Sequence, residues 1–444
     1  MGTGVIGAGT TTGPQAGAGG LRIRWIVLAI LTSSAFMAYV QRTGIGVAAE
    51  RMMPELGLTQ SDIGWLQSAF LVSYTAFQVP GGVAGEIWGA RIVLTLIGLL
   101  AVAATAGTAL LPAVLGGSAL MLGLLVLRFI FGVSQGPIFP VVSGVIESWF
   151  PAGRWGTPQG LLTAGMNLGG AATPPLVAWL MVAFGWQVAL LVTGLPALIT
   201  AGLWWSYGRN RPEEHASVGT AELAELAEAG AHAPPTASRK VTLRDMIRLL
   251  LGREVLLISL SYFLMNYAFY LLGSWCFLYL VEDRHFAILD GGLVASLPWV
   301  AAGIGSAIGG PICDRACQRL GLAWGFRLVP LIGLPTGAAA LMWAVDTDTP
   351  GIAVIALSLA YGAIEMTEGP YWASTTQVAQ EDTMAATGVL NTMANLGGLV
   401  STPIIASLSG AGHWDTAFVT GAVCLLAAAL LWLGVDGGRR ANIH

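Results

Sequence analysis

Apolar runs of about 20 residues follow one another along almost the whole chain, and this feature limits the possible folds more than any other. A run of that length crosses the ~30 Å hydrocarbon core of a bilayer as a single helix. Of the 444 residues, 55% are hydrophobic and only 10% are charged, against roughly 25% charged in an ordinary soluble domain. Because no soluble fold hides so much apolar surface, we expect a membrane protein.

Twelve stretches are long and apolar enough to be membrane-spanning helices. They begin near Ile23, Gln60, Ile92, Ser118, Thr157, Trp186, Val255, Gly291, Trp324, Gly351, Met384 and Thr416. We therefore expect an all-α membrane protein of twelve transmembrane helices in two pseudo-symmetric six-helix bundles. The expected divisions are a disordered N-terminal tail at 1–22, bundles at 23–208 and 255–436, a cytoplasmic central loop at 209–254, and a C-terminal tail at 437–444.

The basic residues are distributed unevenly between the two ends of these spans. Of the 20 Lys and Arg residues, all but four fall in loops or tails on the side that carries the amino terminus. The exceptions are Arg51 and Arg284 on the other side, and Arg42 and Arg128 inside spans. Because Lys and Arg near span ends are retained in the cytoplasm, we expect a multi-pass protein of the bacterial inner membrane with both termini cytoplasmic. An amphipathic run at 241–254 is expected to lie along the inner membrane surface.

The two halves of the chain carry similar short motifs in the same order. Such internal repeats are typical of transporters whose halves are related by an axis along the membrane normal. The matching pairs are SQGPIFP from Ser134 with TEGPYWA from Thr367, GMNLGGAATPP from Gly165 with MANLGGLVSTP from Met393, and GGVAGEIWGAR from Gly81 with GGPICDRACQRLG from Gly309.

The last pair of motifs resembles the cytoplasmic loop signature of the major facilitator superfamily, a glycine followed by an acid and then by basic residues. Within that superfamily, nearly all the spans resemble those of the anion:cation symporter family. The segments that carry this resemblance are SAFLVSYTAFQVPGGVAGEIWGAR, YVQRTGIGVAA, RFIFGVSQGPIFP, YFLMNYAFYLLGSWCFLYLVEDRHF and SLPWVAAGIGSAIGGPICDR. The resemblance implies the transport of a small organic anion, such as a sugar acid, by alternating access. It also implies a conformational latch, which breaks as the halves rock, made of Glu86, Arg91, Asp314 and Arg315.

Arg42 and Arg128 are the two basic residues inside spans. An arginine keeps its proton and is costly at bilayer depth unless it faces a polar cavity. A guanidinium group also matches the geometry of a carboxylate, and the resemblance places equivalent arginines along the family's central cavity. We therefore expect an anion site between them. The alternative, in which either arginine is a structural anchor that extends to an interface, stays open.

Gln41 and Gln135 stand where similar family members have acids that are usually assigned to proton coupling. Glutamine keeps the hydrogen-bonding shape of glutamate but does not titrate. Glu365 and Glu368 supply carboxylates in the tenth span, at a spacing that puts them on one helix face. We expect Glu368, assisted by Glu365, to be the protonatable switch. In the alternative, both glutamates are fixed partners that neutralise the arginines.

Further polar and aromatic side chains are expected at mid-membrane, where they need partners from a neighbouring helix or from a substrate. Together with the two arginines and two glutamines, they form the predicted substrate site and suggest a polyhydroxy or aromatic carboxylate. They are Tyr39, Tyr74, Asn167, Asn266, Tyr270, Trp372, Ser374, Asn391 and Asn395.

Composition narrows the remaining classes of function. The net charge of -4 and the absence of a basic face argue against nucleic-acid binding. The four cysteines and five histidines form no ligand pattern, so we expect neither a metal nor a cofactor. No nucleophile and base motif indicates an enzyme. We expect a monomer that moves a small organic anion with protons; an uncoupled facilitator, an anion exchanger and a non-transporting nutrient sensor stay as alternatives.

Overall fold

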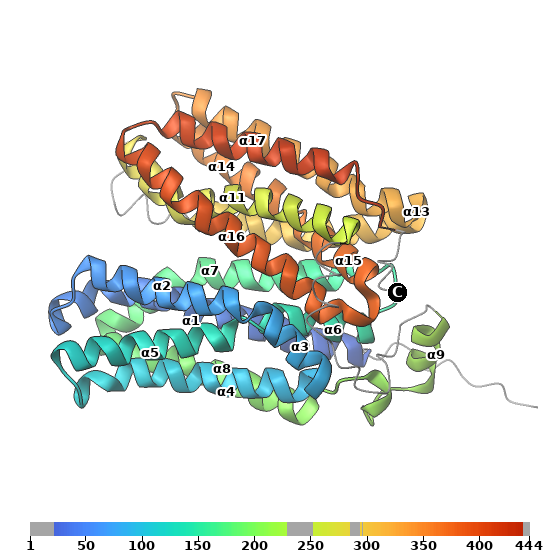
Figure 1. Cartoon of the computed structure of the whole chain (residues 1–444), viewed down its shortest axis with the longest axis horizontal. Helices are drawn as coiled ribbons and strands as arrows, with labels where there is room; N and C mark the ends of the chain where they lie inside the picture. The colour runs from blue at the N-terminus through green and yellow to red at the C-terminus, as the bar shows by residue number, and fades with distance from the viewer. Residues whose placement is uncertain (1–21, 229–251, 285–293, 295, 438–444) are drawn as a thin grey trace, which may run out of the picture.

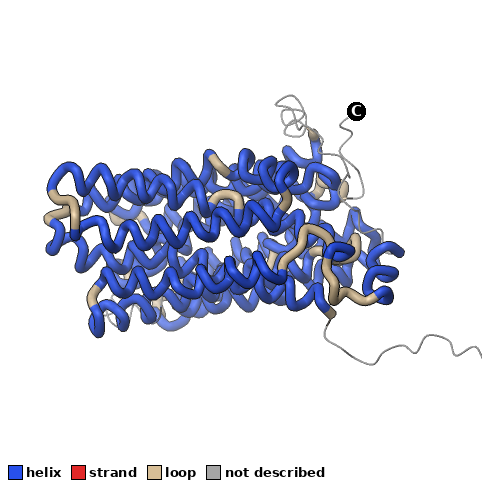
Figure 2. The backbone as a smooth tube through the Cα atoms, turned by 90° about the horizontal axis from the view of Figure 1, so that it is seen from below, coloured by secondary structure: helices blue, strands red, loops and turns tan. Residues whose placement is uncertain are grey.

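The computed structural model describes residues 22–228, 252–284, 294 and 296–437. Over these ranges the chain forms helices and connecting loops without a β-strand (Figure 2). The two predicted tails, most of the predicted surface helix at 241–254 and part of the central loop lie outside the described residues.

The long helices carry the membrane crossings. They are α1 (Ile23–Leu56), α2 (Gln60–Ala76), α3 (Gln78–Trp88), α4 (Ala90–Leu110), α5 (Gly117–Gln135), α6 (Ile138–Trp149), α7 (Gly156–Phe184), α8 (Trp186–Tyr207), α11 (Arg253–Glu282), α13 (Ser296–Asp346), α14 (Pro350–Glu365), α15 (Glu368–Ala379), α16 (Thr383–Gly410) and α17 (Trp414–Trp432). The shorter elements are α9 (Thr220–Glu228), η1 (Leu111–Ala113), η2 (Pro212–Glu214) and η3 (Gln380–Asp382).

The described helices account for the twelve predicted crossings. Ten helical segments are long and apolar enough to cross a membrane. One of them, α13, holds two crossings because Gly321, at a φ of 78°, interrupts the helix. The pair α2 and α3, divided at Phe77, supplies the other crossing. The predicted all-α fold is therefore confirmed, and the predicted starts near Ile92 and Val255 lie within two residues of the observed helix starts.

Local sequence signals explain where several helices begin and break. At the start of α2, Asp62 N donates to Thr59 Oγ1 at 3.2 Å and Thr59 N donates to Asp62 Oδ2 at 2.8 Å, which forms a capping box. The fourth and tenth crossings each break at a Gly-Pro pair that the internal repeat places in both halves. There, α5 gives way to α6 at Pro137, and α14 gives way to α15 just before Pro370, since proline disturbs the helical hydrogen-bond pattern.

Two halves lie side by side, α1 to α8 in one and α11 to α17 in the other (Figure 1). Across the boundary, α7 packs against α13, and α16 packs against α3 and α6. Helix α9 lies at one end of the bundle together with the first turn of α1 and the described end of the chain (Figure 1). We call this end the α9 end.

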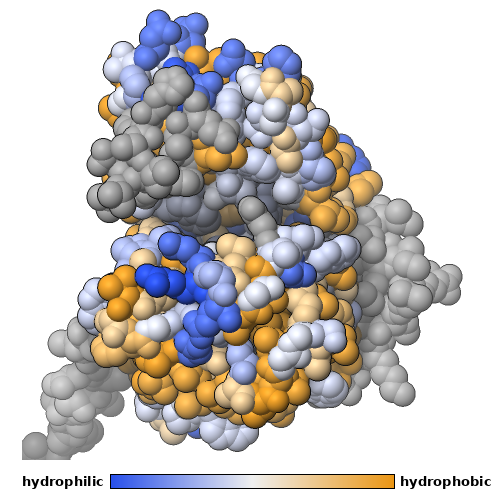
Figure 3. All heavy atoms as spheres, turned by 90° about the vertical axis from the view of Figure 1, so that its left-hand side faces the viewer, coloured by the Kyte–Doolittle hydropathy of each residue, from blue (hydrophilic) through white to orange (hydrophobic). Residues whose placement is uncertain are grey.

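The halves meet closely toward the α9 end. A Cβ atom added to Gly82 of α3 would collide with the Met384 carbonyl of α16, and one added to Gly310 of α13 would collide with the Gly156 carbonyl of α7. At the opposite end, the molecule shows a hollow between the two halves (Figure 3). This arrangement is closed at the α9 end and open at the other.

The outer surface of the bundle is apolar. Large side chains such as Val182, Leu430 and Ile199 are 81%, 66% and 62% exposed. Small residues fill many of the contacts between helices, as Gly169 against Phe36 and other glycines show. An apolar exterior and small-residue interfaces are what a helical bundle in lipid requires.

Candidate functional site

A cavity between the two halves lies about midway along α1, α11 and α16. Its cavity volume is about 40 Å³, and the empty space along its lining, open solvent included, is about 430 Å³. Its lining comes from both halves: Tyr39, Arg42, Tyr74, Phe139, Thr163 and Met166 from one, and Tyr262, Asn266, Phe269, Tyr270, Glu368, Trp372, Asn391, Ala394 and Asn395 from the other. One guanidinium, one carboxylate and several hydroxyl and amide groups therefore face the same space.

Arg42 lies in the middle of α1 and is surrounded by aromatic rings. Its Cζ atom is 4.7 Å from the Tyr74 ring centre and 5.1 Å from the Phe70 ring centre. Its guanidinium donates to Tyr39 Oη at 3.5 Å and to Tyr270 Oη, of the other half, at 3.3 Å. Both bonds are longer than the usual ~2.9 Å. Because a guanidinium has five N–H donors, Arg42 keeps donors for an anion in the cavity.

Arg128 lies in α5 close to Arg42 but is not among the residues that line the cavity. It is buried, and its Nη2 donates to Gln67 Oε1 of α2 at 3.1 Å. Its Cζ is 5.0 Å from the Phe70 ring centre, so Phe70 contacts both guanidinium groups. Arg128 Nε has no hydrogen-bond partner within the described ranges. Neither arginine extends to the outer surface of the bundle.

Glu368, the first residue of α15, contributes its carboxylate to the cavity wall. Its Oε2 accepts hydrogen bonds from Tyr262 Oη at 2.9 Å and from Trp372 Nε1 at 2.8 Å. No ion pair between Glu368 and an arginine is found in the part of the chain that the structure describes. The alternative prediction, in which the glutamates are fixed partners of the arginines, therefore has no direct ion pair of Glu368 to support it in this arrangement.

Glu365, the last residue of α14, lies on the boundary between the halves. Its Oε2 accepts from Asn167 Nδ2 of α7 at 2.5 Å and from Ser306 Oγ of α13 at 3.2 Å. Its Oε1 and Asn167 Oδ1 are both buried without a partner among the described residues. The helix break between α14 and α15 thus places one glutamate at the boundary and the other at the cavity.

A chain of hydrogen bonds joins Arg42 to the other half. Tyr270 Oη, which accepts from Arg42, donates to Asn395 Oδ1 at 2.9 Å. Asn391, one turn earlier on α16, donates to Gln78 Oε1 of α3 at 2.9 Å. The polar lining is therefore already organised around the cavity and connects both halves.

Besides Arg128, four of the predicted substrate-site residues lie outside the lining of the central cavity. Gln41 and Gln135 line a different cavity, inside the N-terminal half, bounded by α1, α4, α6 and α8. Ser374 is fully buried and donates to the Tyr371 carbonyl of its own helix. In this arrangement the rotation of each helix turns these side chains away from the central cavity, so their place in the substrate site stays a prediction. Asn167 also lies outside the lining, at the boundary with Glu365.

The two acids of the predicted latch cap helix starts in the opposite half. Glu86 of α3 accepts from Ala385 N, at the start of α16, at 3.0 Å. Asp314 of α13 accepts from Gly156 N at 2.9 Å and from Thr157 N at 2.8 Å, at the start of α7. The two contacts are pseudo-symmetric, and each places a negative charge at the positive end of a helix dipole.

The two arginines of the predicted latch do not cross the boundary. Arg91 donates to the Trp205 carbonyl at 2.7 Å within its own half. Arg315 lines a separate cavity at the α9 end. Its guanidinium group has no hydrogen bond or ion pair among the residues described. Of the four predicted latch residues, only the two acids bond to the opposite half, because an arginine side chain has no acceptor to offer a helix start.

Sequence reasoning missed several residues that shape this region, chiefly Tyr262, Phe70, Gln67 and Ser306. Tyr262 bonds Glu368, and Phe70 packs against both arginines. Each sits one or more helical turns from a residue that was predicted, and a helix apolar on all faces gives no periodic signal for the side that faces the centre. The i, i+4 spacing of Tyr262 and Asn266 was the available signal.

A family model described as Major Facilitator Superfamily matches residues 31–402. The probable sulfoacetate transporter SauU of Cupriavidus necator is 30% identical over 421 residues, which cover 94% of this chain and 94% of that protein. The hexuronate transporter of Bacillus subtilis is 26% identical over 383 residues, covering 84% of this chain and 85% of that protein.

Solved structures share the fold at low identity. The proton:xylose symporter XylE, bound to 6-bromo-6-deoxy-D-glucose, matches with a TM-score of 0.74 and 16% identity over 95% of this chain and 98% of that one. The human organic anion transporter MFSD10 matches with a TM-score of 0.67 and 15% identity over 92% of this chain and 99% of that one.

Proposed function

The chain belongs to the major facilitator superfamily, a family of transporters rather than enzymes, and on that premise we propose that it carries a small organic anion together with protons by alternating access. The observation that carries the proposal is Arg42, a permanent cation that faces the central cavity and is bonded to Tyr270 of the other half. We further propose a bacterial inner membrane with the α9 end in the cytoplasm, in line with the distribution of basic residues.

The cavity suits an anion with hydroxyl groups or a second polar end. The spare N–H donors of Arg42 match a carboxylate or a sulfonate, and Arg128 adds positive potential from behind the lining. Asn266, Asn391 and Asn395 offer amides to substrate hydroxyls on the opposite wall. A sugar acid fits this pattern, as does a short sulfonated acid; proteins similar to this chain are named as transporters of hexuronate and sulfoacetate.

Proton coupling is assigned to the two glutamates, with different roles. Glu365 acts on the conformation, because a proton on its unpartnered Oε1 would provide a donor for the unpartnered Oδ1 of Asn167 in the other half. Glu368 responds to the cargo, because its carboxylate faces the cavity that contains Arg42. Neutralising Glu368 removes a negative charge that opposes anion entry.

The latch acids supply the gate. In the arrangement described, Glu86 and Asp314 hold the α9 end closed through helix starts of the opposite half. Opening that end requires both caps to break, so we propose that they set the free-energy difference between the two access states. One cap of this type contributes about 1 kcal/mol.

The deciding experiment combines ligand binding with flux. Purified protein is screened by thermal shift against sulfoacetate, galacturonate, galactarate and xylose, and the best ligand is then followed as a radiolabelled solute in proteoliposomes. We expect the anions to stabilise the protein and neutral xylose not to. Arg42→Gln should weaken binding about tenfold or more, the scale of a lost charged hydrogen bond.

Arg51→Gln is the matched control, because Arg51 lies on the same helix but is exposed, outside the cavity lining. Equal affinity in wild type and Arg42→Gln would refute the site. Binding without flux would support a nutrient sensor instead.

An uncoupled facilitator or exchanger is the second candidate, and Gln41 and Gln135 favour it because neither can titrate. In that case a pH gradient would leave accumulation unchanged, while internal unlabelled anion would accelerate uptake if the protein exchanges.

A further inference from the structure

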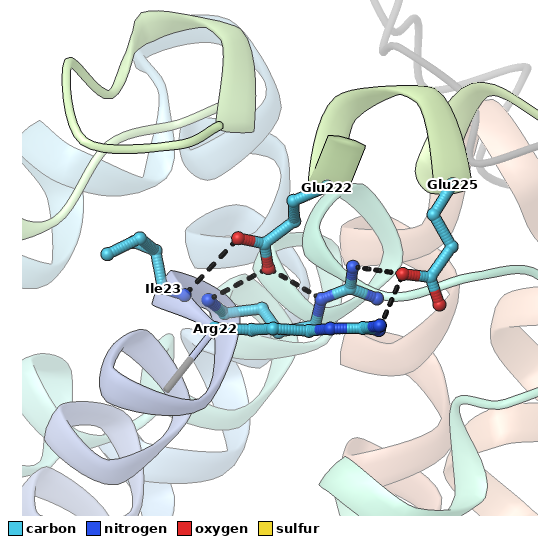
Figure 4. A network of polar contacts seen from close by, with 5 residues as sticks. Arg22, Ile23, Glu222 and Glu225 are labelled. Atoms are coloured by element: carbon cyan, nitrogen blue, oxygen red, sulfur yellow. Dashed lines mark hydrogen bonds and ion pairs between the residues drawn. The ribbon is translucent and has the colours of Figure 1, made fainter. Parts of the chain in front are cut away.

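A second polar region lies at the α9 end, away from the central cavity. Figure 4 shows two carboxylates of α9 above the first turn of α1. Glu222 accepts from Arg24 Nε at 2.7 Å, and Glu225 accepts from Arg22 Nη1 at 2.5 Å and from Arg24 Nη2 at 3.0 Å. Arg24 is only 3% exposed. The α9 helix is therefore fixed to α1 by charge-assisted bonds from Glu222 and Glu225.

A cavity of about 360 Å³ lies beside this contact. Its lining combines Arg22, Arg24 and Glu225 with Arg154, from the loop between α6 and α7, and with Asp314 and Arg315 of α13. It therefore spans α1, α9 and both halves of the protein.

The charges around this cavity do not balance. Four guanidinium groups face two carboxylates. Glu225 is bonded to Arg22 and Arg24, while Asp314 is bonded to the start of α7. The guanidinium groups of Arg154 and Arg315 make no direct hydrogen bond or ion pair with any residue in the described ranges, and the charge of Asp314 acts on Arg154 from a greater distance. Two exposed guanidinium groups without a direct partner, one from each half, thus lie beside one pocket.

We propose that this cavity is a regulatory site for a phosphate-bearing anion, held between Arg154 and Arg315. Phosphate oxygens match the planar donors of arginine, and an anion would offset the positive charge that remains when Glu222, Glu225 and Asp314 are set against the four arginines. Trp25 and Phe150, whose ring centroids are 5.3 Å apart, give the pocket an apolar wall for the carbon part of a phosphate ester.

Occupancy of this site has a conformational consequence. Arg154 belongs to the N-terminal half and Arg315 to the C-terminal half, next to the latch acid Asp314. An anion that bridges them stabilises the arrangement in which the α9 end is closed, because it can contact both arginines only while they are close. The bound anion therefore inhibits transport from the α9 side.

Binding is tested on the full chain in detergent. Inorganic phosphate is titrated against chloride at constant ionic strength, and the melting temperature is recorded. We expect a saturable rise in wild type, and an apparent Kd that is about tenfold weaker or more in Arg154→Gln and in Arg315→Gln. Arg319→Gln, one turn beyond Arg315 on the same helix and outside the pocket lining, should keep the wild-type response.

A second arm separates a soluble phosphate from a lipid headgroup. The same variants are placed in nanodiscs of phosphatidylcholine with and without phosphatidylglycerol, free of inorganic phosphate. If phosphatidylglycerol stabilises the protein and inorganic phosphate does not, and if both pocket variants lose that stabilisation, the site binds a lipid headgroup. No response in either arm, or an equal response in all variants, would overturn the proposal.

Inhibition is tested in proteoliposomes with phosphate added to the side that bears α9. Phosphate should slow the flux of the transported anion in wild type and in Arg319→Gln, but not in Arg154→Gln. All of these variants keep the central cavity intact. A failure of phosphate to inhibit would therefore count against the regulatory site and not against the proposed substrate site. Unchanged flux at saturating phosphate would overturn the regulatory role.

Discussion

The side-chain amide of Asn167, on α7, donates a 2.5 Å hydrogen bond to Glu365, the last residue of α14, and so joins the two halves inside the membrane. Ser306 donates to the same carboxylate oxygen at 3.2 Å. The remaining oxygens of Asn167 and Glu365 are buried and unpartnered in the described structure. Unsatisfied buried acceptors are costly, so the protonation state of this pair bears directly on how tightly the halves adhere.

Replacing Glu365 with Gln should separate conformation from pH. The Gln amide supplies permanently the donor that a proton would supply to Asn167 Oδ1, so we expect the arrangement closed at the α9 end to become more populated. Proton-driven accumulation in proteoliposomes should fall by about tenfold, the effect of ~1.4 kcal/mol, while ligand binding by thermal shift is kept. Undiminished accumulation with an imposed pH gradient would exclude Glu365 from coupling.

Replacing Glu368 with Gln should act on the cargo instead. Removal of the negative charge from the cavity should strengthen anion binding, and the dependence of that binding on pH should disappear, because no carboxylate remains on the cavity wall. Binding is measured by thermal shift between pH 5 and pH 8. If Glu368→Gln keeps the wild-type pH dependence of binding, a group other than Glu368 is responsible for it.

Phe70→Leu should weaken the site without touching a polar group. The ring lies within 5.1 Å of both guanidinium carbons, of Arg42 and Arg128, and each cation–π contact contributes about 0.5–2 kcal/mol. We expect a lower melting temperature and reduced anion affinity. Phe129→Leu is the control, since Phe129 is 43% exposed on the same helix as Arg128. An equal loss in the two variants would show that the effect is not specific to the arginines.

Gly82→Ala and Gly310→Ala should each shift the protein away from closure at the α9 end. An added Cβ would collide with a backbone carbonyl of the opposite half, of Met384 or of Gly156, and backbone cannot move aside as a side chain can. Spin labels on the two halves at this end should report longer distances. Gly202→Ala, which meets nothing within 4 Å, should leave the distances unchanged; an identical distribution in all three variants would contradict the assignment of this end as the closed gate.

Acid should release α9. Burial alone would raise the pKa of Glu225, but the hydrogen bond from Arg22 and the charges of Arg24 and Arg22 outweigh it and lower that pKa below its ordinary value. A lowered pKa means that Glu225 stabilises the contact above the ordinary carboxyl pKa of ~4.3 and that this contribution is lost as the pH falls through the lowered value. Hydrogen exchange of Thr220–Glu228, corrected for intrinsic rates, should lose protection there. Glu225→Gln should be less protected at neutral pH; full protection in that variant would contradict the role of the charge.

The amino-acid sequence was enough to predict that lipid surrounds the protein and that the chain crosses it twelve times. In lipid, every backbone polar group needs a hydrogen-bond partner within the protein, so a spanning segment is a helix. The length of each apolar run therefore corresponds to the thickness of the bilayer. The repeated motifs SQGPIFP and TEGPYWA also indicated the internal symmetry, and in the structure both coincide with a helix break, beside Gln135 and beside Glu368. Arg42 and Arg128 also stood out, because a charge in a span is rare enough to carry information.

Which polar side chains meet depends on the packing of the helices, which the sequence did not reveal. Gln41 and Gln135 line a cavity within one half, whereas Glu365 finds Asn167, which is 198 residues away in the chain. The reason is that membrane helices are apolar on all faces, so periodicity does not reveal how each is rotated about its axis. That rotation is set by close packing at small residues such as Gly82 and Gly310, and it becomes known only when both halves are in place.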